Sequence, residues 1–482
     1  MSKPSIAKNY LYQIVYQIMQ IIIPLITAPY LMRVLGAEGN GIYSYVYSIA
    51  DYFVAFGALG IATYGNRLIA QSRDNRHALN NAFSSLLCAH VLVSGIVLVV
   101  YLVFFAFFGG AYSTYYAIMI PLIISGIFDI SWFFYGLEEF KIAVTRNIAI
   151  KVLSAILIFM FVRTEADLWK YLAITSLSTL VGTAVLWFHI NRYVRFVKPS
   201  ISETLKHIRP LCVLFVSTLA VSLYTKMDKI MVGQLSDMTQ VGYYEGAYKI
   251  YAILNGIAAA FGTVMLPRMS NIVANHDENA INRQMKYSFK YIMCVSVAIS
   301  FGMYAVSTTL IPIYYGDAYV DSIHVLKILS ISSIFCNMAH IIRTHFLLPH
   351  SMDKEQVACV VVAAIGNVLV NAALIPFLGA SGAAIGTVFA ELTALIVQIV
   401  LVKKYIKISK NLLPTIVYSL FGFVMVLVVK FIEQLMGITV LSLAVETLVG
   451  AIVYLLLCLI YLIITKDPLI LRCINRIKNK IA

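Results

Sequence analysis

The chain has 482 residues, of which 61% are hydrophobic and only 12% charged, and its mean hydropathy is +0.87. This composition excludes a water-soluble globular protein and indicates a polytopic membrane protein. The formal net charge of +14 falls in short clusters between apolar segments, so we interpret it as a topology signal and expect no nucleic-acid partner.

The N-terminal ten residues are polar, and the apolar run that follows has no small-residue cleavage site. We therefore expect a retained first helix rather than a signal peptide. Fourteen apolar segments follow one another along the chain, at roughly 10–32, 42–65, 81–108, 115–136, 147–162, 170–190, 210–235, 241–266, 288–312, 324–347, 357–377, 382–402, 411–432 and 441–464. They predict an all-α polytopic membrane protein with about 14 transmembrane helices.

The distribution of basic residues predicts the orientation of the chain. If the N-terminus is cytoplasmic, 28 of the 36 lysines and arginines lie before the first segment, in or close beside the even-numbered connections, or after the last segment. The other eight are Arg33, Arg163, Lys170, Lys226, Lys229, Lys249, Lys327 and Lys430. Because lysine and arginine concentrate on the cytoplasmic side of membrane proteins, we expect both termini to be cytoplasmic.

The chain also contains an internal repeat. Four residues have the same residue type 201 positions later: Gly41, Tyr43, Tyr47 and Arg67 correspond to Gly242, Tyr244, Tyr248 and Arg268. The longest inner connection, residues 191–210, separates two sets of six segments, which predicts parallel repeats with the substrate site between them. We expect an N-terminal six-helix lobe at 1–198, a C-terminal six-helix lobe at 199–410, and accessory helices with a basic cytoplasmic tail at 411–482.

The seventh segment, near 211–235, carries Lys226, Asp228 and Lys229 inside an apolar run. A cation near the middle of a membrane helix costs about 2.5–3.5 kcal/mol on insertion scales. At about 100° per residue the two lysines share a face, and Asp228 can neutralise at most part of the pair. We interpret this face as part of a water-filled cavity for an anion. Alternatively, Asp228 and Lys229 pair with a neighbouring helix while Lys226 reaches the surface.

Four further basic residues are candidates for the same cavity. Arg33 ends the first segment, and Lys249 lies two turns into the eighth. The repeat-related Arg67 and Arg268 are expected at the inner mouth, where a guanidinium group suits phosphate because it binds two oxygens at once. The alternative for these two arginines is ordinary anchoring at the cytoplasmic surface.

Acidic residues in the segments are candidates either for ion coupling or for pairing. Glu245 lies four residues before Lys249, which predicts an ion pair between them. Asp51 and Glu391 have no partner nearby in the sequence, so we consider them as binding groups for a proton or a sodium ion.

The first segment contains Pro24 and Pro29. Proline removes a backbone donor and weakens the helix around it. We therefore predict that a bend in this helix acts as a gate, with a static kink as the alternative.

We expect neither a cofactor nor a metal site. The seven cysteines include no C-x-x-C pair, and they resemble packing residues. The histidines at 340, 345 and 350 are spaced at five, which places them on drifting faces of a helix and argues against a shared metal.

Five stretches resemble a known family: they are 29–46, 64–74, 132–140, 227–250 and 366–391. The chain is similar over nearly its whole length to the oligosaccharide and polysaccharide repeat-unit flippases, which export O-antigen and capsule units. These belong to the MATE-like superfamily, together with the MATE drug antiporters and the lipid II flippases. The resemblance implies a MATE-like fold that moves an undecaprenyl-pyrophosphate-linked oligosaccharide across the bacterial cytoplasmic membrane by alternating access. It also implies membrane lipids, a polysaccharide polymerase and chain-length machinery as partners.

Other functions are weighed against this one. A flippase for lipid II or for a teichoic-type glycolipid differs only in its substrate. A multidrug cation antiporter of the same fold requires an acidic or apolar cavity, which the lysine pair disfavours. A membrane glycosyltransferase or polymerase needs acid and base groups on a sizeable outer loop, and every expected outer loop is short, so we predict a transporter rather than an enzyme.

Overall fold

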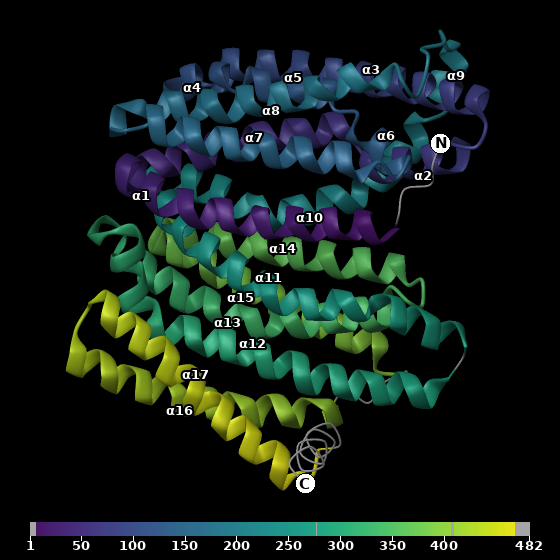
Figure 1. Cartoon of the computed structure of the whole chain (residues 1–482). Helices are drawn as coiled ribbons and strands as arrows, with labels where there is room; N and C mark the ends of the chain where they lie inside the picture. Colours follow the sequence, from purple (N-terminus) through teal and green to yellow (C-terminus); the bar gives the residue numbers. More distant parts are fainter. Residues whose placement is uncertain (1–5, 276, 406–408, 468–482) are drawn as a thin grey trace. The chain divides into compact units, whose positions relative to one another are not determined.

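The computed structural model describes residues 6–275, 277–405 and 409–467, in which every regular element is a helix (Figure 1). Residues 468–482, which form most of the predicted basic tail, lie outside the described ranges. The described chain divides into two compact units, one ending at Gly242 and the other beginning at Tyr243. The all-α polytopic membrane fold predicted from the composition is confirmed.

The first unit contains the helices up to the start of α11. They are α1 (Ile6–Ala58), α2 (Ile61–Ser72), α3 (Arg76–Phe108), η1 (Gly110–Tyr112), α4 (Ser113–Ile118), α5 (Ile120–Phe128), α6 (Ser131–Gly136), α7 (Phe140–Phe161), η2 (Glu165–Asp167), α8 (Leu168–Ile190), α9 (Ile201–Leu205) and α10 (Ile208–Leu235). A core of apolar side chains joins α2, α3, α6 and α8, with Phe83, Trp132 and Leu186 buried in it.

The second unit contains the remaining helices. They are α11 (Met238–Ala274), α12 (Glu278–Tyr315), η3 (Asp317–Tyr319), α13 (Ser322–Ile342), η4 (Arg343–Leu347), α14 (Asp353–Leu378), α15 (Ala380–Val402), α16 (Ser409–Met436) and α17 (Val440–Ile464). α16 and α17 pack against each other and against α12, with Tyr418 and Tyr454 buried in that core.

The predicted lobe boundary at 198/199 differs from the division between the two compact units. α10 packs against α1 and α2, so the first unit includes it and extends to Gly242. α11 therefore begins in the first unit and continues into the second. The predicted lobes describe the sequence repeat, and they stay a prediction.

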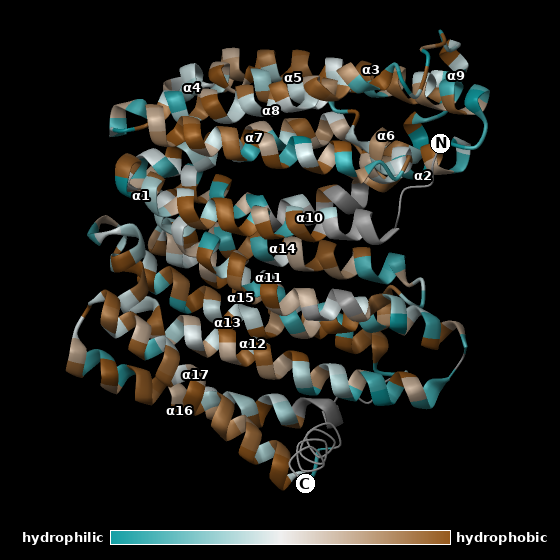
Figure 2. Ribbon diagram, in the orientation of Figure 1, coloured by the Kyte–Doolittle hydropathy of each residue, from teal (hydrophilic) through white to brown (hydrophobic). Residues whose placement is uncertain are grey.

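Ten helices of the described chain are long and apolar enough to cross a membrane, or up to twelve if each of two bent pairs forms one span. This count treats α1 and α2 together as a single span, Ile14–Ser72, and does not include α10, so the predicted number of fourteen is not confirmed. Figure 2 shows hydrophobic residues along the helices and hydrophilic residues gathered at many of their ends and connections. Large apolar side chains remain exposed on α3, α14, α16 and α17, as expected for surfaces that face lipid.

A glycine divides α1 into two arms. Gly36 adopts φ 64° and ψ −177° inside the helix, a left-handed conformation that costs glycine little because it has no Cβ. The Asn40 Nδ2 group donates hydrogen bonds to the Leu31 oxygen at 2.9 Å and the Gly36 oxygen at 2.8 Å. The carboxamide thus binds backbone oxygens freed by the bend, and the two arms match the first two predicted segments.

The repeat-related residues occupy similar local structures. Tyr43 and Tyr47 form a stacked pair with ring centroids 5.6 Å apart, and Tyr244 and Tyr248 form one at 5.8 Å. Within the first unit, the backbones of α1 and the start of α11 approach each other closely. A Cβ atom placed on Gly41 would lie 1.7 Å from the Met238 oxygen, and one on Gly242 would lie 1.9 Å from the Ala37 oxygen.

Candidate functional site

The central feature of the first unit is an ion pair between α1 and α10. The Lys226 ammonium donates a hydrogen bond to Asp51 Oδ2 across 175 positions of sequence. Both side chains are partly exposed, at 32% for Lys226 and 23% for Asp51. The acid that compensates Lys226 is therefore one for which the sequence indicated no neighbour.

Two nearby contacts hold α10 along the second arm of α1. The Tyr52 hydroxyl donates to the Ser222 carbonyl oxygen at 2.9 Å. Near the other end of α10, Gln234 Nε2 donates to the Tyr45 hydroxyl. These bonds fix the register of the two helices, and that register places Lys226 opposite Asp51.

The other two charges of α10 differ in exposure. Asp228 is almost fully buried, at 2% exposed, whereas Lys229 remains partly exposed, like Lys226. This difference agrees with the helical geometry, which places the two lysines on one face and turns Asp228 away from Lys226. Of the three charged residues of this segment, the two lysines are therefore the accessible ones.

Three other predicted basic residues lie on exposed positions of different helices. Arg33 is exposed on the first arm of α1, three residues before the bend at Gly36, and Arg67 is exposed on α2. Arg268 is exposed on α11 in the second unit. Their role as phosphate-binding residues stays a prediction.

The second unit holds the remaining acidic candidates. Glu245 Oε1 lies 3.3 Å from Lys249 Nζ within α11, the pair that the spacing predicts. Glu391 of α15 is buried and lies within hydrogen-bonding reach of the Cys336 thiol and close to Tyr251. Ion coupling at Glu391 stays a prediction.

α1 remains a continuous helix through both of its prolines. The Thr27 hydroxyl donates to the Ile23 carbonyl oxygen at 3.0 Å, a bond that supports the backbone between Pro24 and Pro29. Beyond Pro29, the Tyr30 hydroxyl donates to the Val162 oxygen at 2.6 Å at the end of α7. On the side that follows the prolines, α1 is thus anchored to α7.

Arg146 and Lys151 of α7 were not predicted as site residues. In the sequence they counted only among the basic residues of the cytoplasmic side. The Arg146 Nη2 group donates to the Ser131 hydroxyl at 2.7 Å, and that hydroxyl donates to Asp129 Oδ1 at 2.5 Å. The Lys151 ammonium donates to Gln20 Oε1 of α1. One signal could have identified Lys151 beforehand, because it lies inside the apolar segment 147–162 rather than in the connection before it.

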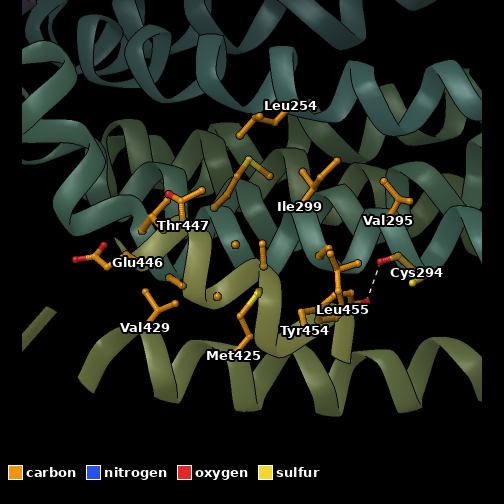
Figure 3. Close-up of a pocket in the computed structure, with 17 residues that line it drawn as sticks. Leu254, Cys294, Val295, Ile299, Met425, Val429, Glu446, Thr447, Tyr454 and Leu455 are labelled. Atoms are coloured by element: carbon orange, nitrogen blue, oxygen red, sulfur yellow. Dashed lines mark hydrogen bonds between the residues drawn. The ribbon is translucent and has the colours of Figure 1, made fainter. Parts of the chain in front are cut away.

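The second unit also contains a partly open apolar cavity of about 400 Å³. Figure 3 shows its lining, which comes mainly from α12, α16 and α17, with Leu254 of α11 on another side. Glu446 is the acidic residue in this lining; it is fully buried and accepts a hydrogen bond from the Thr309 hydroxyl at 2.9 Å. The cavity is shaped for an apolar group and offers few polar contacts.

Among the residues that the structure describes, no group of three or more histidine, cysteine or acidic side chains is arranged to hold a metal ion. His345 is instead bonded through both ring nitrogens, to the Ser288 hydroxyl and the Gly262 oxygen, at 2.8 Å each. His340 contacts Arg343 at 2.7 Å. The bonds of His345 are structural contacts to α12 and α11, whereas that of His340 joins residues one turn apart.

Two protein-family models and a protein described as a transporter match this chain. The family model described as "Polysaccharide biosynthesis protein" matches residues 6–273, and the model for "Lipid II flippase MurJ" matches residues 202–430. A protein of Escherichia coli (strain K12) described as "Putative O-antigen transporter" is 25% identical over 390 residues, which cover 80% of this chain and 93% of that protein.

Two solved structures show where the fold occurs elsewhere. The lipid II flippase MurJ in an inward closed conformation matches 95% of this chain and 99% of its own, with a TM-score of 0.66 and 15% identity. An inward-facing multidrug resistance MATE family transporter matches 81% of this chain and 95% of its own, with a TM-score of 0.60 and 15% identity. The chain therefore has the MATE-like fold.

Proposed function

Because the chain belongs to the polysaccharide biosynthesis protein family, we propose that it is a flippase that carries a lipid-linked oligosaccharide from the cytoplasmic to the outer leaflet of a bacterial cytoplasmic membrane. The protein described as "Putative O-antigen transporter" supports this proposal, because it aligns with 80% of this chain at 25% identity. The proposed substrate is an undecaprenyl-pyrophosphate-linked repeat unit, and the proposed mechanism is alternating access between two lobes. A polysaccharide polymerase with its chain-length machinery would receive the product.

The ion pair between Lys226 and Asp51 is the observation that carries the mechanism. Moving an unpaired ion into hydrocarbon costs about 20 kcal/mol by the idealised Born estimate, so a pyrophosphate group needs cationic partners along its path. Asp51 compensates Lys226 while the site is empty. A pyrophosphate group carries more negative charge than one carboxylate and competes with Asp51 for the ammonium, while Lys229 supplies a second cation on the same face.

Deletion of the gene tests the proposed function. The deletion strain is expected to lose its surface polysaccharide and to accumulate a complete lipid-linked repeat unit, measured by mass spectrometry of extracted lipids. Complementation with the wild-type gene serves as the control. Normal surface polysaccharide without accumulation of the intermediate would contradict the proposal.

A lipid II flippase is the second candidate, because the corresponding family model matches residues 202–430. The same deletion experiment separates the two functions. Accumulated lipid II together with failure of cell-wall synthesis would support this alternative, whereas an accumulated oligosaccharide repeat unit supports the first proposal.

The proposed orientation, with both termini in the cytoplasm, predicts which positions react with a membrane-impermeant thiol reagent. On a cysteine-free background, Ala111→Cys and Asp237→Cys should be labelled from outside in intact cells, whereas Asn75→Cys and Ser200→Cys should react only after permeabilisation. All four positions are exposed, so a lack of labelling cannot be ascribed to burial. Labelling of Ser200→Cys in intact cells would overturn the orientation.

The gate proposal predicts that a Pro24→Ala, Pro29→Ala double variant accumulates normally but exports glycan several-fold more slowly. Alanine restores two backbone donors and stiffens α1 where a bend is proposed. The rate of appearance of surface polysaccharide measures the effect, and Pro414→Ala in the accessory helix α16 is the control. Wild-type export by the double variant would show that the prolines impose only a static kink.

A further inference from the structure

Lys151 is a half-buried cation of α7 with no acidic partner among the described residues. No carboxylate of the described residues lies within 4 Å of its ammonium group, which instead donates to the neutral Gln20 side chain of α1. Lys226, by contrast, is compensated by Asp51. A lysine in a membrane span needs an opposing charge or access to water, and an amide oxygen supplies only part of that compensation.

Arg146, one and a half turns before Lys151, adds to the positive charge of this part of α7. One Nη2 donor binds the Ser131 hydroxyl, while its Nε group is buried and has no hydrogen-bond partner among the described residues. Asp129 is the nearby acid, and its Oδ1 atom already accepts bonds from the Ser131 hydroxyl and backbone. Asp129 is therefore an acid close to Arg146, and among the described residues donors remain unused on both cations.

The bond between Lys151 and Gln20 also holds α1. α1 and α7 pack side by side, and their contact at the other end consists of the Tyr30 hydroxyl on the Val162 oxygen and the Tyr30 ring 4.7 Å from that of Phe159. Pro24 and Pro29 lie between Gln20 and Tyr30. The Gln20 contact therefore anchors the segment that precedes the prolines, and the Tyr30 contact anchors the segment that follows them.

We infer that Lys151 and Gln20 form an oxyanion-binding site, and that an anion bound to Lys151 displaces Gln20 and releases the first part of α1. The ligand class is an oxyanion of the lipid-linked saccharide, either its pyrophosphate or a sugar carboxylate. An oxyanion adds charge–charge attraction to the hydrogen bond from the Lys151 ammonium, and a neutral amide oxygen cannot supply this attraction, so such an anion outcompetes the Gln20 amide. The inference rests on the proposed function for the source of the anion.

Binding to the purified full-length protein tests the site without any transport assay. Inorganic pyrophosphate and glucuronate are titrated separately by calorimetry, and Lys151→Gln is expected to weaken one of them by about tenfold or more. Gln20→Glu should weaken the same probe, because the new carboxylate pairs with Lys151, whereas Gln20→Ala should not. Lys141→Gln removes the same charge from an exposed position of α7 and should leave binding unchanged.

The two probes distinguish the two sources of the anion. Weakened pyrophosphate binding assigns the site to the lipid-linked phosphate, and weakened glucuronate binding assigns it to an acidic sugar. If Lys151→Gln binds both probes as the wild type does, the inference is overturned. That result would leave the proposed function standing, since the deletion experiment decides the function independently.

Hydrogen exchange measures the release of α1. The probe that depends on Lys151 should accelerate amide exchange in residues 14–23 of the wild-type protein and leave it unchanged in Gln20→Glu. Exchange that slows in the wild type, or stays constant under saturating probe, would overturn the coupling between the anion and α1.

Discussion

Gly242→Ala should prevent the accumulation of folded protein. A Cβ atom at this position would lie 1.9 Å from the Ala37 carbonyl oxygen, and the obstacle is backbone rather than a flexible side chain. Relief requires α1 and the start of α11 to move apart. Overpacking in a tight core typically costs about 1–3 kcal/mol, and a clash with fixed backbone belongs at or above the upper end of that range. Thermal unfolding of the purified protein and its abundance in the membrane measure the effect.

The reciprocal change and a matched control complete this experiment. Gly41→Ala should be as damaging, because its Cβ atom would lie 1.7 Å from the Met238 oxygen. Gly256 lies in the same helix as Gly242, and a Cβ there meets no atom within 4 Å. Gly256→Ala should therefore be neutral or stabilise the protein by up to about 1 kcal/mol. Wild-type abundance and melting temperature in Gly242→Ala would contradict the close approach of the two backbones.

Loss of charge at Lys226 and Lys229 should abolish glycan export. Lys226→Gln by itself leaves Asp51 without its cation, so we expect the abundance of this variant to fall. Breaking a buried ion pair lowers the free energy of unfolding by about 3–5 kcal/mol. The loss should be smaller here, because this pair is partly exposed. Adding Asp51→Asn should restore abundance, because the remaining pair of amides is neutral. Export should nevertheless stay low in this double variant, since the ammonium that is proposed to bind the pyrophosphate is absent.

Further variants at the same site test whether export requires the positive charge of these lysines. Lys226→Arg and Lys229→Arg should each retain much of the export activity, whereas a Lys226→Gln, Lys229→Gln variant on the Asp51→Asn background should export at most about a tenth of the wild-type amount, by analogy with the loss of one charged hydrogen bond. Surface polysaccharide per unit of membrane-inserted protein is the measurement. If the triple variant exports as much glycan as the wild type, these lysines have no role in transport.

Much of this protein follows from local sequence patterns. Apolar runs of membrane-spanning length determine that the fold is helical and polytopic, because backbone groups in lipid must bond within their own helix. The match between Gly41 and Gly242, and between the two tyrosine pairs, was visible as one offset in the sequence and recurs as similar local geometry in the structure. The pairing of Glu245 with Lys249 also followed from spacing, since both residues lie on one helix face.

Tertiary structure alone decided which charges compensate one another. Lys226 and Asp51 are 175 positions apart, and Lys151 and Gln20 are 131 apart; helical periodicity indicates which face a residue occupies but not which helix lies opposite. The bonds of Tyr52 and Tyr45 to α10 set the register that joins Lys226 to Asp51. The sequence therefore determined that cations lie inside the membrane spans. Packing between distant helices determined that Lys226 is compensated by a carboxylate and that Lys151, within the described part of the chain, bonds to an amide.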